Sequence, residues 1–277
     1  PPPVDHAPGA SLAAMSTSET SVSAIRRVGV LGAAGRMGRT TCDAVVAAPG
    51  LELVAVADPS AVGDEISGCT VLGGVADLIE VGVDVVVDFT VADASRASLP
   101  VLAAAGIHAV VGTSGLDEDD RVSLDAAFSS SACLIVPNFA IGAVLMQRFA
   151  ELAAPWFDTA EIIELHHNGK VDAPSGTALA TAHRMAAASS DWADDATESE
   201  TVAGARGGAG PAGIRLHAVR MRGMVAHQEV VLGTTGQTLT IRHDLIDRDG
   251  FMPGVVVAVL GVDGTGCTVG LDALLGP

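Results

Sequence analysis

Aromatic residues are scarce in this sequence of 277 residues, where they make up 3%, and tyrosine is absent. Proteins that bind single-stranded nucleic acids need aromatic side chains on which bases stack, beside basic grooves. Positive charge is scarce as well, because 15 Lys and Arg stand against 33 Asp and Glu, for a formal net charge of -18. A surface this acidic repels phosphate backbones and anionic lipid head groups. We therefore expect neither a nucleic acid nor a membrane as a partner.

Long apolar runs are also missing, although 49% of the residues are hydrophobic. Each run is interrupted by a charged residue, His, Pro or Gly well before the roughly 18 residues that a membrane-spanning helix requires. The cysteines lie far apart, without the close pairs that zinc ligation or a redox motif needs; they are Cys42, Cys69, Cys133 and Cys267. We expect free thiols, no metal site, and a reducing, cytoplasmic location.

The first half of the chain has the pattern of an α/β domain. Residues 1–24 are rich in Pro, Ser, Ala and Thr without periodicity, which predicts a disordered tail. From residue 25 on, β-branched runs alternate with Ala-rich stretches of helical length, as in βαβ units. The expected strands are 28–31, 51–57, 83–89, 109–112 and 134–136, and the expected helices are 39–47, 92–105 and 117–128. This order predicts a Rossmann-type, doubly wound parallel sheet.

The alternation changes near residue 138, which predicts a second domain. A helix is expected at 141–157, a strand at 160–166 and, after a polar loop, a second helix from residue 177; three strand-like runs follow at 214–221, 224–232 and 238–245. Successive strands without helices between them predict a mostly antiparallel sheet and an α+β domain. The apolar segment 251–262 is expected to pack back on the first domain as a helix. We therefore expect one domain from 25–139 with 250–277, and another from 140–249.

A glycine-rich motif follows the first expected strand directly and consists of Gly32, Ala33, Ala34, Gly35, Arg36, Met37 and Gly38. Glycine lets the backbone turn sharply and approach a pyrophosphate, which then lies at the N-terminus of a helix. Asp58 ends the next expected strand and follows Gly38 by about 20 residues, the separation of the acid that binds the adenosine ribose hydroxyls. Strand, turn, helix, strand and acid in this order predict nucleotide binding.

Two further loops end the third and fourth expected strands. One contains Asp88, Phe89 and Thr90, and the other contains Gly112, Thr113, Ser114 and Gly115. The carboxyl ends of parallel strands form the ligand crevice of an open sheet, so both loops can contact the nicotinamide half of a dinucleotide. Taken alone, either loop also fits a helix cap or a turn.

The most informative segment lies between the strand expected at 160–166 and the helix expected from residue 177. His166 and His167 end the strand, Lys170 follows, and the helix begins at Ser175, Gly176 and Thr177. The N–H groups of a helix start can bind a carboxylate. His166 or Lys170 could then deliver a proton beside it, because burial lowers the pKa of either group toward neutrality. The structural alternative is a pair of surface histidines and a simple N-cap at Ser175.

Lysine is used only once in the chain, at Lys170, against 14 arginines. An ammonium group can shift its pKa and release a proton, which a guanidinium group cannot do. The single lysine therefore favours a proton-donor role for Lys170.

Together these motifs resemble the dihydrodipicolinate reductase family, also called 4-hydroxy-tetrahydrodipicolinate reductases, and most of all its actinobacterial members. The resemblance rests on the segment from His166 to Thr177, the glycine motif, Gly112 with Thr113, and residues 137–142. It implies reduction of a small cyclic dicarboxylate by NADH or NADPH in the diaminopimelate route to lysine. It also implies that the second domain binds the substrate and that its sheet assembles a homotetramer.

The same resemblance implies roles for individual residues. His166 takes the position of the general acid/base and Lys170 that of the proton donor, while His167, Gly176 and Thr177 take substrate-binding positions. The cofactor positions fall on the glycine motif, Asp58, residues 112–114, Val136, Pro137, Asn138 and Phe139. Some enteric members have Arg after the ribose-binding acid, where this chain has Pro59, so that Arg36 is the candidate for contacting the 2′-phosphate of NADPH. Hydride addition to a conjugated imine leaves negative charge on the neighbouring carbon, so a proton donor is required.

Two alternative functions remain open at the level of sequence. One is another dehydrogenase on the same fold, such as a semialdehyde or hydroxy-acid dehydrogenase. An acylating semialdehyde dehydrogenase needs a reactive cysteine, but Cys133 has no basic neighbour in the sequence. The other is a non-catalytic dinucleotide sensor, which would not need His166, Lys170 and an anion-binding helix start together. Loss of NADH absorbance that depends on substrate distinguishes the three functions.

Overall fold

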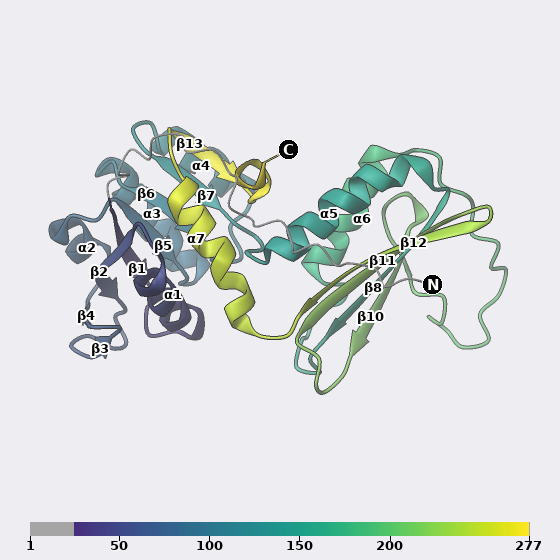
Figure 1. Ribbon diagram of the computed structural model, residues 1–277, viewed down its shortest axis with the longest axis horizontal. Helices are drawn as coiled ribbons and strands as arrows, with labels where there is room; N and C mark the ends of the chain where they lie inside the picture. Colours follow the sequence, from purple (N-terminus) through teal and green to yellow (C-terminus); the bar gives the residue numbers. More distant parts are fainter. Residues whose placement is uncertain (1–24, 277) are drawn as a thin grey trace, which may run out of the picture.

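A computed structural model describes residues 25–276 and shows two domains side by side (Figure 1). One is built on an eight-stranded sheet and the other on a five-stranded sheet. The tail expected at 1–24 lies outside the described residues. The fold class predicted from the sequence, a doubly wound α/β domain with a second α+β domain, is confirmed.

The first sheet has the strand order β13-β7-β6-β5-β1-β2-β4-β3. Its strands are β1 (Arg26–Leu31), β2 (Leu51–Ala57), β3 (Glu65–Ile66), β4 (Cys69–Leu72), β5 (Val85–Asp88), β6 (His108–Val111), β7 (Ala132–Ile135) and β13 (Gly266–Val269). All neighbours are parallel except β3 and β4. The chain proceeds outward from β1 in both directions, so the loops after β1 and β5 border the switch point at which such sheets bind ligands.

Helices cover both faces of this sheet, which accounts for the fully buried valines of its central strands, Val28, Val30, Val85, Val86 and Val87. The helices are α1 (Arg36–Ala47), α2 (Val75–Val81), α3 (Ala92–Ala104), α4 (Glu118–Ala127) and α7 (Met252–Gly261). Residues of α1 and α7 pack together in one buried cluster, and residues of α2, α3 and α4 pack in the other. The helix expected at 251–262 is therefore α7, which lies on the same face as α1 (Figure 1).

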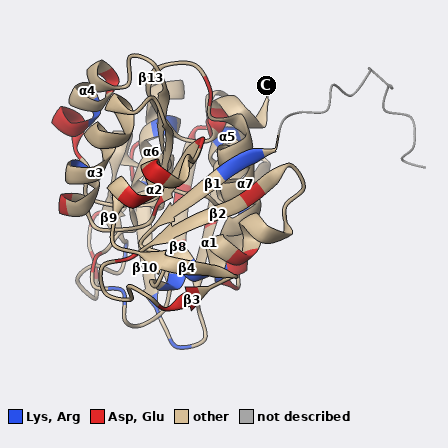
Figure 2. Cartoon of the chain, turned by 90° about the vertical axis from the view of Figure 1, so that its left-hand side faces the viewer, with Lys and Arg blue, Asp and Glu red and all other residues tan. Residues whose placement is uncertain are grey.

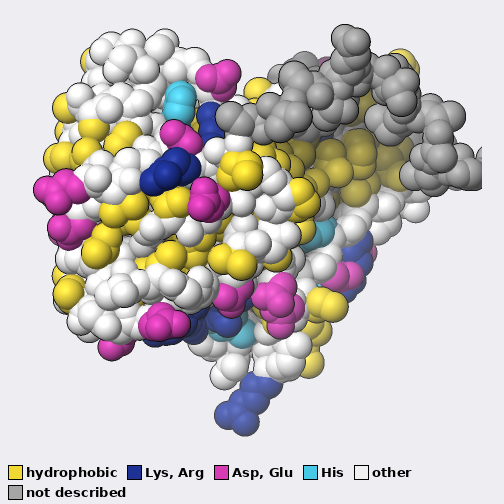
Figure 3. Space-filling view, turned by 60° about the vertical axis from the view of Figure 1, so that its left-hand side comes forward, with side chains coloured by type: hydrophobic (Ala, Val, Ile, Leu, Met, Phe, Trp, Pro, Cys, Tyr) yellow, Lys and Arg dark blue, Asp and Glu magenta, His cyan; other side chains and the backbone are white. Residues whose placement is uncertain are grey.

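Acidic residues recur along α2, α3 and α4 (Figure 2). On the described part of the face that Figure 3 shows, basic side chains are interspersed with acidic, neutral and hydrophobic ones. Arg96, for example, pairs with both Asp93 and Asp120. In the part of the chain that the structure describes, no helix is both long and apolar enough to span a membrane.

The second domain consists of a sheet with helices on one face. Its strand order is β12-β11-β8-β10-β9, with β8 (Thr159–His166), β9 (Gly208–Ala209), β10 (Arg215–Arg220), β11 (Ala226–Thr234) and β12 (Gln237–Leu245). The helices α5 (Ile141–Ala153) and α6 (Gly176–Ala188) pack on the face that includes Ile162, Val230 and Leu232. A 3₁₀ turn at Ala154–Trp156 ends the helix that the sequence predicted to continue to residue 157.

Strand pairing in the second domain is mostly antiparallel, as expected, but one pair differs. β10 and β11 follow each other in sequence without being neighbours, because β8 lies between them. β8 pairs with β11 in the antiparallel and with β10 in the parallel sense. This order places the end of β8, with His166, in the middle of the sheet.

All four cysteines are free thiols, as the sequence predicted. Cys42, Cys133 and Cys267 are buried, and Cys69 is half-buried. Burial raises the pKa of the Cys42 thiol to about 12, which makes this thiol a poor nucleophile.

Candidate active site

The glycine motif forms a tight turn between β1 and α1. Gly32 has a φ of +75°, and a Cβ on it would lie 2.8 Å from the carbonyl oxygen of Phe89. A Cβ on Gly38 would lie 2.1 Å from the carbonyl oxygen of Gly32. Only glycine fits either position. Gly35 caps α1 without a side-chain hydrogen bond, so that the first N–H groups of the helix remain available to an anion such as a pyrophosphate.

Asp58 lies beside this turn, at the end of β2. Its carboxylate accepts hydrogen bonds from the backbone N of Ala34 at 3.1 Å, the backbone N of Ser60 at 2.9 Å and Oγ of Ser60 at 2.6 Å. Burial raises the pKa of Asp58, but these hydrogen bonds outweigh it and hold the pKa below its usual value. The structure therefore brings together an ionised carboxylate and the glycine turn, as a ribose and a pyrophosphate require.

The loops after β5, β6 and β7 meet next to the glycine turn. A Cβ on Gly112 would lie 2.1 Å from the ring of Phe89, and the centroids of the Phe89 and Phe139 rings are 5.5 Å apart. Thr113 donates to the fully buried Asp88, which also accepts from Thr90 and Ser95. These contacts hold three loops that are distant in the sequence together at one edge of the sheet.

The predicted cofactor residues differ in how they can act. Ser114 and Arg36 are exposed, whereas Ala33 and Val136 lie in the hydrophobic core. The side chains of Ala33 and Val136 support the loops, and only their backbone atoms could face a ligand.

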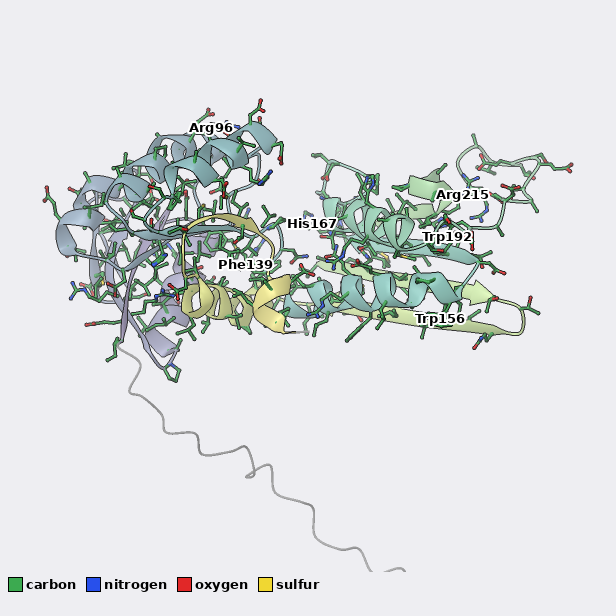
Figure 4. All side chains as sticks on the ribbon, turned by 90° about the horizontal axis from the view of Figure 1, so that it is seen from above. Arg96, Phe139, Trp156, His167, Trp192 and Arg215 are labelled. Atoms are coloured by element: carbon green, nitrogen blue, oxygen red, sulfur yellow. The ribbon has the colours of Figure 1, made fainter. Side chains whose placement is uncertain are left out.

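A cleft of about 200 Å³ lies where the two domains join. It is lined by residues of the segment 137–140 that joins the domains, of α5, β8, α6, β11 and β12, and by Phe251. Among them are Asn138, His166, Thr177, Gln228 and His243. Asn138 spans the junction, because its Nδ2 donates to Oγ1 of Thr177 at 3.3 Å and its Oδ1 accepts from the backbone N of Ala140 at 2.9 Å. The labelled Phe139 and His167 mark the two sides of this junction (Figure 4).

His166 enters the cleft from the end of β8. Its Nδ1 lies 2.5 Å from Oε2 of the buried Glu164. Burial lowers the pKa of His166, and this effect outweighs the neighbouring Glu164 carboxylate, which raises it. Burial thus favours the neutral ring, and one ring nitrogen is held by Glu164.

Lys170 and His167 lie on the loop between β8 and α6 and do not line the cleft. Nζ of Lys170 pairs with both carboxylate oxygens of Asp172, at 2.7 and 2.8 Å. The backbone N of Lys170 donates to the carbonyl oxygen of His167, which closes a turn. Gly176 also lies outside the lining, although its neighbours Ser175 and Thr177 belong to it. The roles of Lys170, His167 and Gly176 stay predictions.

Sequence reasoning missed several residues of the cleft. Gln228 is 4% exposed, and its Nε2 donates to Oγ1 of Thr181 at 2.8 Å. Its Oε1 has no hydrogen-bond partner among the described residues. In the sheet Gln228 lies between Glu164 on β8 and His243 on β12. Glu164, Gln228 and His243 thus form a row across three strands. Only the strand register reveals this row, and no local signal in the sequence marks it. Within residues 25–276, no group of three or more His, Cys, Asp or Glu side chains could hold a metal ion.

Comparison with protein families gives two adjoining matches. The description "Dihydrodipicolinate reductase, N-terminus" matches residues 26–139, and "Dihydrodipicolinate reductase, C-terminus" matches residues 142–275. The chain is 51% identical to the 4-hydroxy-tetrahydrodipicolinate reductase of Beutenbergia cavernae over 257 residues, which cover 90% of this chain and 98% of that protein. It is 50% identical to the enzyme of the same name from Nocardia farcinica, with the same coverage.

Solved structures agree with this assignment. A dihydrodipicolinate reductase from Paenisporosarcina sp. TG-14 with bound dipicolinate is 34% identical and superposes with a TM-score of 0.80, covering 90% of this chain and 99% of that one. An engineered D-amino acid dehydrogenase bound to NADP⁺, 16% identical with a TM-score of 0.54, shares the fold alone. The prediction of an NAD(P)H-dependent oxidoreductase is confirmed. The chain belongs to the dihydrodipicolinate reductase family, whose enzymes carry out a reduction step of diaminopimelate and lysine biosynthesis.

Proposed function

We propose that the chain reduces 4-hydroxy-tetrahydrodipicolinate in the cleft at the domain junction, with the nicotinamide half of the cofactor entering from the first domain. The observation that carries this proposal is the hydrogen bond from Asn138 to Thr177. It joins a loop at the cofactor edge to the start of the helix expected to bind the substrate. The same cleft contains His166, the candidate for moving the proton.

The first domain has the groups that a dinucleotide needs. The N-terminus of α1 would hold the pyrophosphate, and the Asp58 carboxylate would accept hydrogen bonds from the ribose hydroxyls. The exposed Arg36 is free to meet a 2′-phosphate, which supports use of NADPH as well as NADH. When bound, the reduced nicotinamide supplies the hydride.

The second domain holds a small dicarboxylate through a helix start and basic side chains. The N–H groups of Gly176 and Thr177 receive one carboxylate at the N-terminus of α6, where the helix dipole favours an anion. The relative from Paenisporosarcina, solved with dipicolinate bound, supports a substrate of this class. His167 and Lys170 meet the other carboxylate when their loop turns toward the cleft, which requires Lys170 to leave Asp172.

His166 and Lys170 hold and deliver the proton that the reaction needs. Hydride addition leaves negative charge on the neighbouring carbon, and a proton donor must stand beside that carbon. His166 faces the cleft through the ring nitrogen that Glu164 does not hold. Lys170 lies four residues further along the chain, on the loop after β8, and supplies the second candidate.

The test combines an activity assay with two Lys170 variants. We expect loss of NADH absorbance only when the dicarboxylate is present. Both Lys170→Ala and Lys170→Arg should lower kcat by roughly 10² to 10⁴-fold, because guanidinium keeps the charge but cannot release a proton. A near-normal kcat in Lys170→Arg would make Lys170 an electrostatic anchor and leave His166 as the proton donor. Cofactor binding without turnover in the unaltered protein would instead support a sensor.

We also propose a cytoplasmic homotetramer that assembles through the second sheet. The helices α5 and α6 cover one face of this sheet, while Ile163, Leu165 and Val231 on the other face are only half-buried. Four free thiols support a reducing compartment. Sedimentation equilibrium should give four times the chain mass, and a monomer at micromolar concentration would contradict the assembly.

A further inference from the structure

Glu164 is a fully buried carboxylate with a complete set of hydrogen-bond donors. Arg220 donates from Nη1 to Oε2 and from Nη2 to Oε1, each at 2.8 Å. The backbone N of Ser175 donates to Oε1 at 3.0 Å, and Nδ1 of His166 lies 2.5 Å from Oε2. Moving a carboxylate out of water costs free energy, and buried carboxylates are therefore found paired and hydrogen-bonded. Burial raises the pKa of Glu164, but Arg220 and His166 outweigh it and keep the pKa below its usual value.

The strand register explains why these groups meet. Glu164 and His166 are two residues apart on β8 and therefore lie on the same face. Arg220 is the partner of His166 in the parallel pairing of β8 with β10, so its side chain reaches the same face. The cluster is thus set by the order of strands in the sheet.

An ionised carboxylate next to Nδ1 decides which nitrogen of His166 carries the proton. Glu164 can only accept, so Nδ1 must donate, and the lone pair of the neutral ring lies on Nε2. Since His166 lines the cleft, Nε2 is the nitrogen available to a bound molecule.

Arg220 also contacts the loop that carries Lys170. Its Nη2 also donates to the carbonyl oxygen of Asp172 at 2.7 Å, two residues beyond Lys170. Glu164 itself holds the backbone of Ser175, the N-cap of α6. One ion pair therefore contacts His166, the loop that carries Lys170 and the start of the helix that carries Thr177.

We propose that Glu164 is a positioning residue of the reaction: it presents Nε2 of His166 to the cleft, stabilises the imidazolium when His166 holds a proton, and aligns the start of α6 with the ring. This inference rests on the proposed role of His166. Arg220 keeps Glu164 ionised and in place.

Among the charged groups of residues 25–276 that surround His166, Glu164 alone favours the protonated ring. Lys170 from the loop and Arg220 from β10 lower the pKa of His166, as burial does more strongly. His227 from β11 and His243 from β12 line the same cleft, and His227 is paired with Asp244. The residues of α5 and α6 in the lining are uncharged.

Glu164→Gln removes the charge and keeps the shape of the side chain. We expect kcat to fall roughly tenfold or more at neutral pH, because an imidazole loses its orienting carboxylate, while the KM for the dicarboxylate changes little. The pKa of His166, followed by NMR of the labelled imidazole without ligands, should fall, and the limb of the kcat profile that depends on protonated His166 should move to lower pH. The matched control is Glu161→Gln on the opposite face of β8, which should leave the pKa of His166 unchanged.

Two results would overturn the proposal. In the unaltered protein, ¹⁵N NMR should show neutral His166 with the proton on Nδ1, and a proton on Nε2 would refute the assignment even if Glu164→Gln does not fold. An unchanged pKa and kcat in Glu164→Gln, with only a lower melting temperature, would make the cluster purely structural. If instead His166→Gln keeps normal kcat while the NMR results hold, the proposed role of His166 fails and the positioning of its ring stands.

Discussion

Strand β8 carries two chemically matched clusters on its opposite faces. On one face Glu164 contacts His166 and Arg220; on the other, Glu161 contacts His217 and Arg206. Each cluster joins one carboxylate, one imidazole and one guanidinium. The side chain of Glu164 is 0% exposed and that of Glu161 is 33% exposed. Residue types alone therefore do not distinguish a site from a surface ion pair.

Placement distinguishes the two clusters. Glu161 binds Nε2 of His217, and its partner Arg206 also pairs with Asp195, which in turn pairs with Arg215 at the far end of the second domain (Figure 4). Glu164 instead holds Nδ1 of His166 and leaves Nε2 to the cleft, next to Thr177 and Asn138. Water screens the partly exposed cluster of Glu161, whereas burial strengthens each contact of the Glu164 cluster.

The strongest test of this comparison exchanges the two histidines for glutamine. His166→Gln should lower kcat by roughly 10² to 10⁴-fold, the contribution of general acid catalysis. His217→Gln should lower kcat by less than about tenfold, because its ring has no access to the cleft. Steady-state kinetics with saturating NADH measures both. Equal losses in the two variants would contradict the assignment of His166.

Replacing the arginine of each cluster compares how much the two clusters contribute to the free energy of unfolding. Arg220→Met should lower the free energy of unfolding by about 3 to 5 kcal/mol, since it leaves a buried carboxylate unpaired. Arg206→Met should cost about 0 to 1 kcal/mol, as expected for a partly exposed pair. Urea denaturation at neutral pH measures both losses. Because the folded pKa of Glu164 lies below its usual 4.5, its stabilising contribution is complete above that pH and is lost on acidification, so Arg220→Met should approach the unaltered protein in acid.

Asp58 is a third carboxylate to compare with Glu164 and Glu161. Its hydrogen-bond donors are neutral N–H and O–H groups instead of an arginine. Asp58→Ala should weaken NADH binding by about 1.5 to 3 kcal/mol, the range of hydrogen bonds to a charged group. NADPH should lose less, because the same carboxylate repels its 2′-phosphate. Calorimetric titration with both cofactors is the measurement, and equal losses would remove Asp58 from the ribose site.

The smallest expected effect concerns Thr177, whose hydroxyl contacts Asn138 at the mouth of the same cleft. Thr177→Val should raise the KM for the dicarboxylate roughly three- to tenfold, in line with one hydrogen bond. The effect on kcat should be smaller, because this contact acts in the ground state as well as in the transition state. Thr177→Ser keeps the hydroxyl and should retain the KM of the unaltered chain.

The grouping of the candidate cofactor residues at one edge of the sheet could be predicted from the sequence because its signals are local. The glycine motif, Asp58 and the loops at Phe89 and Gly112 each follow a strand directly, and the carboxyl ends of parallel strands meet at one edge. The segment around His166 was recognisable for the same reason. Its chemistry is contained in a dozen consecutive residues.

The rest of the cleft depends on pairings that no single segment encodes. Arg220, Gln228 and His243 reach it through the register of β10, β11 and β12, which is set by packing of the whole sheet. The parallel pair of β8 and β10 was not predicted, because successive strands were expected to be neighbours. Short elements such as β3, β9 and β13 contain too few residues for a periodic pattern to show.

Because β13 pairs with β7, the first domain is complete only after a strand that follows the second domain in the sequence has been made. During synthesis, residues 26–135 leave the ribosome long before Gly266–Val269 can pair with Ala132–Ile135. Until then β7 is an unprotected sheet edge, and the face of the sheet that α7 covers stays open to water. Such an edge can pair with other nascent chains. A ribosome stalled after the second domain would therefore hold a first domain that is prone to aggregate.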